Sequence, residues 1–170
     1  LLRDNGFGRF DDLNMAGNPM SASIHYAGDR FFIATPPSGH AQIIDIYGDR
    51  RAASPPTELL LVALATCAAA DDVAILEKKR QKVTDYRVNI TGTRADDHPQ
   101  RFLAFHINHI VYGQTLSEKA VADAIFLSES KYCPIAATVR PTAEITSSFE
   151  VIELNQQLLE PKGYEPISNP

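Results

Sequence analysis

The chain has 170 residues, of which 44% are hydrophobic and 22% are charged, and a formal net charge of −5 at pH 7. These values are near the averages of globular proteins, so they argue against global disorder and favour a single domain large enough to bury a core. The acidic balance and the lack of a basic stripe argue against a nucleic-acid-binding surface.

The two ends of the sequence lack hydrophobic periodicity. Residues 1–19 show no capping pattern, so we predict either a leader ahead of a native start at Met20 or an unstructured arm. The alternative is an extension that packs on a partner. Residues 154–170 are rich in proline and polar residues and predict a C-terminal tail. The folded domain is therefore expected over residues 20–153.

The first half of this domain predicts short strands followed by a long helix. Two or three strands are expected over residues 21–46, where SASIHYA and RFFIAT flank a Gly-Asp turn. A helix is expected from about Thr57 to Arg80, after two prolines at its entry. Its first half is apolar nearly all round, which indicates a buried helix rather than an amphipathic surface helix. The apolar run, residues 59–70, is shorter than the ~20 residues of a bilayer span, so no membrane partner is predicted.

The second half alternates strands with a second helix. Alternation over residues 86–91 predicts a half-buried strand, and a longer strand returns after a turn. Thr115 and Glu118 have capping-box spacing and open a helix that ends near Cys133. Residues 143–153 predict a closing strand, and this order, with neighbouring strands able to form antiparallel hairpins, indicates an α+β fold. The longer strand carries five residues on one face: Leu103, Phe105, Ile107, His109 and Val111.

The histidines predict no metal site. His106 and His109 are three residues apart on a strand and point to opposite faces, and His109 is interpreted as a packed core residue. The sequence also contains no Walker, GxGxxG or zinc-deaminase pattern, so we expect neither a metal nor a cofactor.

The two cysteines are the strongest chemical candidates. Free cysteines in such a domain are most often inert core residues, because the thiol behaves as a small apolar group. Cys67 and Cys133 lie 66 positions apart, so only the fold can bring them together. If it does, the pair is the minimal equipment of a thiol-dependent peroxidase. Cys67 lies too far into its helix to gain from the helix dipole, and Asp71 one turn later disfavours the thiolate.

Charged residues elsewhere are candidates for the same site. Glu58 precedes Cys67 by nine residues, about 2.5 turns, so it faces the opposite side ~13 Å away along the helix axis. Glu58 therefore joins Cys67 only from a second chain, or it is a helix N-terminal carboxylate that the dipole favours. A reactive Cys67 needs a cation, most simply an arginine. The candidates, each also explained as a solvated surface charge, are Arg30, Arg50 and Arg51.

Three segments together resemble the OsmC/Ohr family over roughly residues 20–153: SGHAQIID, SPPTELLLVALATCAAADDVAIL and LSESKYCPIAA. The shared features are Ser-Pro-Pro-x-Glu-Leu-Leu ahead of the helix with Cys67, the Cys-x-x-x-Asp-x-Val continuation, and Cys133 in a Lys-Tyr-Cys-Pro setting. Their joint order and spacing are specific. The sequence is most similar to the OsmC-like, YhfA-type branch.

The resemblance implies an OsmC-like α+β fold, in which antiparallel sheets from two intertwined chains enclose long central helices, with active sites at the homodimer interface. It implies that Cys67 attacks an organic hydroperoxide to give a sulfenic acid, that Cys133 resolves it as a disulfide, and that an external dithiol restores both thiols. It also implies an arginine, here Arg30, that holds the thiolate and a glutamate, here Glu58, that orients this arginine. Thr57 stands where the family pattern has the acid, so Glu58 is rotated by ~100° on the helix.

The resemblance leaves a rival class of function. The rival is a non-catalytic dimer that binds an apolar ligand or senses redox state, and a third interpretation is thiol exchange without peroxide specificity. We predict the hydroperoxide reductase, because apolar neighbours of Cys67 suit an apolar substrate tail. These neighbours are Leu64, Ala68 and Ile75. No secretory segment opens the sequence and two cysteines make no disulfide scaffold, so a cytoplasmic location is expected.

Overall fold

The computed structural model describes residues 19–46 and 52–154. These residues fall into two compact units, one ending at Pro56 and one starting at Thr57, and each unit is described by itself. The predicted N-terminal leader or arm and the predicted C-terminal tail lie almost entirely outside the described residues.

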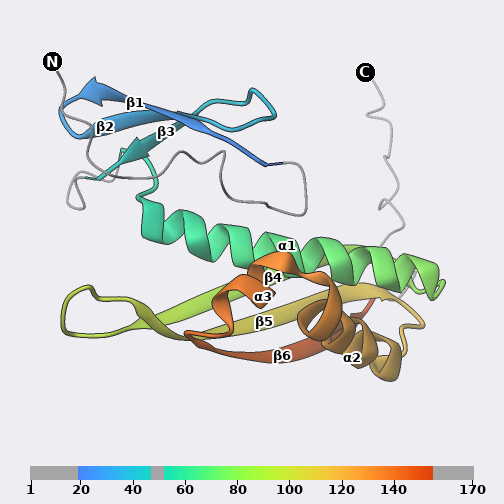
Figure 1. The fold of residues 1–170 in the computed structure, drawn as a ribbon. Helices are drawn as coiled ribbons and strands as arrows, with labels where there is room; N and C mark the ends of the chain where they lie inside the picture. Colours follow the sequence, from blue (N-terminus) through green and yellow to red (C-terminus); the bar gives the residue numbers. More distant parts are fainter. Residues whose placement is uncertain (1–18, 47–51, 155–170) are drawn as a thin grey trace, which may run out of the picture. The chain divides into compact units, whose positions relative to one another are not determined.

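The first unit is an antiparallel sheet with the strand order β1–β2–β3 (Figure 1). The turn between β1 and β2 uses left-handed backbone, with φ of 90° at Gly28 and 62° at Arg30. Arg30 is thereby fixed at one end of this sheet. The short strands predicted from the sequence are confirmed: β1 (Ser23–Gly28), β2 (Phe31–Thr35) and β3 (Gln42–Asp45).

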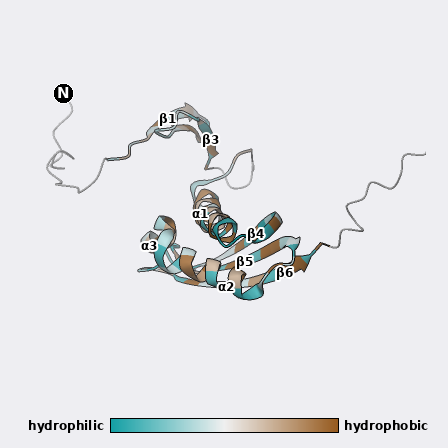
Figure 2. Cartoon of the chain, turned by 90° about the vertical axis from the view of Figure 1, so that its right-hand side faces the viewer, coloured by the Kyte–Doolittle hydropathy of each residue, from teal (hydrophilic) through white to brown (hydrophobic). Residues whose placement is uncertain are grey.

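The second unit packs helices against another three-stranded sheet, in the order β4–β5–β6. Helix α1 lies along this sheet in Figure 1 and above one of its faces in the end-on view of Figure 2. The α+β class predicted from the sequence is therefore confirmed. The elements in chain order are α1 (Pro56–Lys78), β4 (Lys82–Arg94), β5 (Phe102–Gln114), α2 (Glu118–Leu127), a π-helical segment (Ser128–Tyr132), α3 (Pro134–Val139) and β6 (Glu144–Glu153).

The core of this unit lies between α1 and one face of β5. Phe105 and Ile107 pack with Leu64 of α1, and all three are almost completely buried. The alternation predicted for β5 is confirmed by these residues and by the buried Val111. Leu103 differs, since it is 40% exposed. It lies at an irregularity in the β4–β5 pairing, where the register shifts and an extra residue leaves the regular alternation.

Strand β6 pairs with β5 in parallel, from Ala104 opposite Glu144 to Gly113 opposite Glu153. The prediction that neighbouring strands form antiparallel hairpins is therefore correct for β4 and β5 but wrong for β6. The reason is the connection between β5 and β6, which contains two helices. Such a crossover returns the chain to the end of the sheet where β5 begins.

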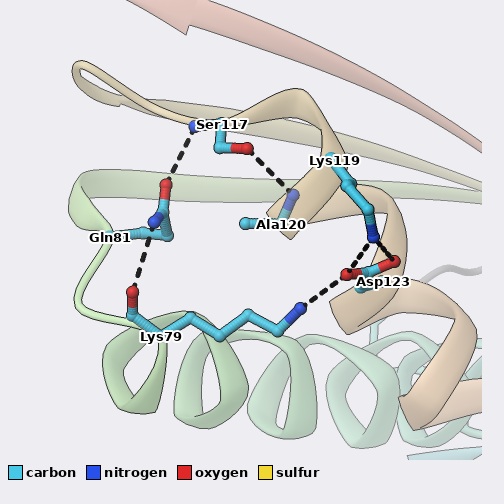
Figure 3. A network of polar contacts seen from close by, with 6 residues as sticks. All are labelled: Lys79, Gln81, Ser117, Lys119, Ala120 and Asp123. Atoms are coloured by element: carbon cyan, nitrogen blue, oxygen red, sulfur yellow. Dashed lines mark hydrogen bonds and ion pairs between the residues drawn. The ribbon is translucent and has the colours of Figure 1, made fainter.

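Helix α2 is capped by Ser117. The capping-box spacing predicted Thr115 as the cap, and that prediction is wrong. Ser117 Oγ accepts a hydrogen bond from the backbone N–H of Ala120 at 3.3 Å. The backbone N–H of Ser117 donates to Gln81 Oε1 at 2.8 Å, which ties the start of α2 to the turn after α1 (Figure 3). Thr115 instead has a φ of 56° and donates its backbone N–H to Glu153 Oε2 at 2.9 Å.

Helix α1, with 23 residues, is long and apolar enough to cross a membrane by length and composition alone. In this structure it packs on the sheet through Leu64, Ala68 and Leu76, and it buries the carboxyl group of Asp72 completely. It is therefore a core helix of the second unit. Val62 on the same helix is 56% exposed, so the helix is not buried on every side.

Candidate active site

The fold brings the two cysteines together. Cys67 lies in the middle of α1 and Cys133 directly before α3, and their Sγ atoms are within 4.8 Å of each other. Cys133 is 2% exposed, whereas Cys67 is only partly buried. Desolvation by burial and, to a smaller extent, the hydrogen bond to Cys67 raise the pKa of Cys133 to about 11. The pair thus consists of a buried, protonated thiol beside a more accessible one.

Cys133 is positioned by hydrogen bonds on both sides. Its backbone N–H donates to the carbonyl oxygen of Ser128 at 2.9 Å, which closes the π-helical segment. Its Sγ accepts the backbone N–H of Ala136 at 3.3 Å, so the sulfur is the N-cap of α3. Pro134 follows at the first helical position, where a missing N–H costs little. The sequence predicted one helix ending near Cys133, and the structure adds the π-helical segment and the second helix start that hold this sulfur near α1.

Asp71 is the third polar side chain at this site, beside the two thiols. It follows Cys67 by one helical turn, and one of its carboxylate oxygens lies within 4.8 Å of both Sγ atoms. The buried Ser128 hydroxyl donates to the carbonyl oxygen of Ala68 at 3.3 Å and lies 3.5 Å from Asp71 Oδ2. From the sequence, Asp71 was placed on the same helix face as Cys67 but not assigned to the site. The i, i+4 spacing was the signal that could have identified it.

A pocket of about 250 Å³ opens beside Asp71. Asp71 thus lies between the thiol pair and a space that a small molecule can enter. Of the three apolar residues expected around a substrate tail, Ile75 lines this pocket, whereas Leu64 and Ala68 are buried in the core. The other lining residues are Ala74, Lys78, Leu127 and Tyr132.

The charged candidates are not placed beside the thiols within the second unit. Glu58 is exposed in the first turn of α1, and the continuous helix keeps it about 2.5 turns before Cys67. Glu58 of the same chain therefore does not reach this thiol. Arg30 belongs to the turn of the first unit, so its role at the site stays a prediction. Arg50 and Arg51 lie outside the described residues.

A second buried polar cluster joins α1 to the sheet. The Tyr86 hydroxyl donates to Asp72 Oδ2 at 2.6 Å and lies 2.7 Å from His109 Nδ1. A Tyr86 hydroxyl that donates to Asp72 can accept from His109 only in the tautomer that carries its proton on Nδ1. Burial and then the charge of Asp72 raise the pKa of Tyr86. His109 is fully buried, as predicted, but it is also a polar partner, which sequence reasoning missed because the cluster joins three separate elements, α1, β4 and β5.

These features place the chain in a known family. A family profile described as OsmC-like protein matches residues 48–148. The chain belongs to the OsmC-like protein family. It is 36% identical over 133 residues to Protein YhfA of Escherichia coli strain K12, covering 78% of this chain and 98% of that protein. The resemblance to the OsmC/Ohr family inferred from the three sequence segments is therefore confirmed.

Solved structures agree with this assignment. A hypothetical protein from Aquifex aeolicus aligns with a TM-score of 0.74 and 27% identity, over 82% of this OsmC-like chain and all of that chain. The organic hydroperoxide resistance protein OhrB of Bacillus subtilis aligns with a TM-score of 0.56 and 12% identity, over 78% and 98% of the two chains. The likeness to OhrB concerns the fold alone. The two structures together confirm that this chain has the OsmC fold.

Proposed function

We propose that this OsmC-like protein reduces organic hydroperoxides by a two-cysteine mechanism. The observation that carries the proposal is the convergence of Cys67 and Cys133, whose Sγ atoms lie within 4.8 Å in one chain. Their unequal burial supports unequal roles, because the attacking thiol must meet a peroxide and the resolving thiol needs only to meet its neighbour.

The proposed reaction has three balanced steps. The Cys67 thiolate attacks one peroxide oxygen, the O–O bond breaks, and protonation releases an alcohol and leaves a sulfenic acid at Cys67. The Cys133 thiol then attacks this sulfur, forming the disulfide and releasing water. An external dithiol reduces the disulfide by thiol–disulfide exchange and is itself oxidised. Such a cycle needs a reducing compartment, which supports a cytoplasmic location.

A homodimer completes this proposal. Apolar side chains stay exposed in the single chain on both units, with Val62 on α1 at 56% and Ile24 and Ile43 on the first sheet at 62% and 63%. Surfaces of this kind are commonly covered by a partner. The proposal requires that, in the dimer, Glu58 of the second copy reaches Cys67, which Glu58 of the same chain does not reach. We propose that it orients Arg30, which in turn holds the thiolate.

The test compares hydroperoxide consumption by the wild type and by single-cysteine variants. With cumene hydroperoxide and a dithiol, we expect turnover by the wild type, none by Cys67→Ser, and a sulfenic acid that dimedone traps in Cys133→Ser. Mass spectrometry of the oxidised wild type should show an intrachain disulfide. Wild-type consumption no faster than that of Cys67→Ser overturns the proposal. Glu58→Gln should lower turnover, whereas Glu77→Gln, at an exposed position on the same helix, should not.

The pocket beside Asp71 supports a second candidate function, the binding of an apolar ligand without chemistry. Ile75 and Leu127 contribute apolar lining to this pocket, and Lys78 and Tyr132 contribute polar groups. If this is the function, a fluorescent fatty acid binds equally to the wild type and to Cys67→Ser, and neither consumes peroxide. A Leu127→Lys substitution should then abolish binding.

A further inference from the structure

Cys67, Asp71 and Cys133 together have the chemistry of a metal-binding set. All three donor atoms, two Sγ and one carboxylate oxygen, lie within 4.8 Å of one another. In a tetrahedral zinc site, metal–sulfur bonds of about 2.3 Å and metal–oxygen bonds of about 2.0–2.2 Å place the donors roughly 3.5–3.8 Å apart. The three atoms therefore need to move inward by only about 1 Å to share one ion.

We propose that the reduced protein binds one thiophilic divalent cation, of the Zn²⁺ class, through Cys67, Cys133 and Asp71. Two thiolates select a borderline or soft ion and disfavour Mg²⁺ and Ca²⁺, which prefer oxygen ligands alone. The carboxylate supplies a third, harder donor. Metal binding would use the same two thiols as the peroxide reaction. It differs from that reaction because it needs no oxidant and the thiols act as ligands.

The surroundings of the three donors suit such a site. Cys67 and Asp71 are one turn apart on a single helix, so their spacing is fixed by the backbone. Cys133 is held by the backbone bonds that end the π-helical segment and start α3. Ser128 lies 3.5 Å from Asp71 Oδ2, in the position of an outer group that orients a ligand. Among the described residues, these three are the one set of His, Cys, Asp or Glu side chains whose donor atoms converge in this way.

The pocket adjoins the proposed site through one of its three ligands. Asp71 belongs to both the donor set and the pocket lining, whereas neither cysteine lines the pocket. A water molecule from the pocket can then complete a four-coordinate geometry with three protein ligands. Because both thiolates are ligands, the metal-bound protein cannot form the Cys67–Cys133 disulfide, a consequence that rests on the proposed function.

The experiment uses the full chain, reduced with a phosphine and freed of metal with a chelator that is then removed. Co²⁺ is the probe, because thiolate-to-cobalt charge transfer absorbs in the near ultraviolet, and Zn²⁺ should displace it. We expect one Co²⁺ per chain and a band that is lost or at least halved in Cys67→Ser and in Cys133→Ser. Asp71→Asn should weaken binding by at least about tenfold, and Glu77→Gln should bind like the wild type.

Several results overturn the metal proposal. They are no charge-transfer band in the wild type, a band that is unchanged in either cysteine variant, or a binding constant that Asp71→Asn leaves unaltered. Thermal unfolding without metal shows which variants are folded, and Zn²⁺ should raise the midpoint of the wild type but not that of Cys67→Ser. Peroxide consumption is measured separately with a chelator present. If the wild type with the chelator consumes no peroxide, only the proposed function is refuted. If the wild type with Co²⁺ shows no charge-transfer band, only the metal site is refuted.

Discussion

The buried cluster of Asp72, Tyr86 and His109 yields the sharpest prediction about stability. Replacing Tyr86 by phenylalanine keeps the ring and creates no cavity, but it removes the 2.6 Å hydrogen bond to Asp72 and the 2.7 Å contact with His109. A hydrogen bond to a charged group contributes about 1.5–3 kcal/mol. The remaining approach of His109 Nδ1 to Asp72 Oδ2, at 3.2 Å, offsets a part of this loss.

We therefore expect Tyr86→Phe to lower the free energy of unfolding by about 2 kcal/mol and the thermal midpoint by about 4–8 °C. Urea unfolding at pH 7 measures the first quantity, with an unchanged slope against denaturant. Tyr112→Phe is the matched control, because Tyr112 lies on β5 and contacts Arg87 through its ring, which the substitution keeps. The control should change stability by less than about 0.5 kcal/mol. A Tyr86→Phe variant as stable as the control refutes the role assigned to this cluster.

The same residue predicts the response to alkali. The pKa of Tyr86 is raised in the folded state by burial and by Asp72, so the unfolded chain releases the phenolic proton at a lower pH than the folded chain does. Stability should therefore fall as the pH rises above about 10, by at most about 1.4 kcal/mol per pH unit. This part of the alkaline decline should be missing in Tyr86→Phe.

Three further predictions follow from the site and the second helix. The pKa of Cys133 is raised to about 11, so wild-type stability should also fall between its usual value of 9.0 and pH 11, and Cys133→Ser should remove this decline. Native protein treated with iodoacetamide at pH 8 should be modified at Cys67 first, with Cys133 modified only after unfolding, as mass spectrometry of peptides would show. Ser117→Ala should cost about 0.5–2 kcal/mol in urea unfolding by removing the cap of α2, whereas Thr115→Ala should not destabilise. Equal losses in these two variants would mean that Ser117 is not the cap.

The regular elements could be predicted from the sequence because their signals are local. The apolar run after two prolines predicted α1, and the strict alternation around Phe105 and Ile107 predicted the inward face of β5. The same local logic failed where competing bonds decided the outcome. Thr115 has the capping-box spacing, but Ser117 takes the cap because Thr115 adopts a positive φ and bonds to β6.

Properties that join distant segments could not be predicted from local patterns. The parallel pairing of β6 depends on the whole crossover, and the meeting of Cys67 with Cys133 depends on the π-helical segment, for which the sequence has no marker. The pairing of Cys67 with Cys133 was predicted by the resemblance to the family. The Cys-x-x-x-Asp-x-Val motif placed Asp71 on the helix face of Cys67, but its approach to Cys133 was not predicted, because helix periodicity shows which face a residue occupies and not what that face meets.

The Cys133 sulfur caps α3, so a change from thiol to disulfide at this atom can affect the backbone at the start of that helix. Cys133 Sγ accepts the N–H of Ala136, and a bond to Cys67 requires the two sulfur atoms to approach to about 2.05 Å from a separation of up to 4.8 Å. If the Cys133 sulfur is the one that moves, the hydrogen bond that it accepts from the Ala136 amide lengthens or breaks. Hydrogen exchange at this amide should then be faster in the disulfide form than in the thiol form, so one backbone proton would report the redox state of the protein without an added label.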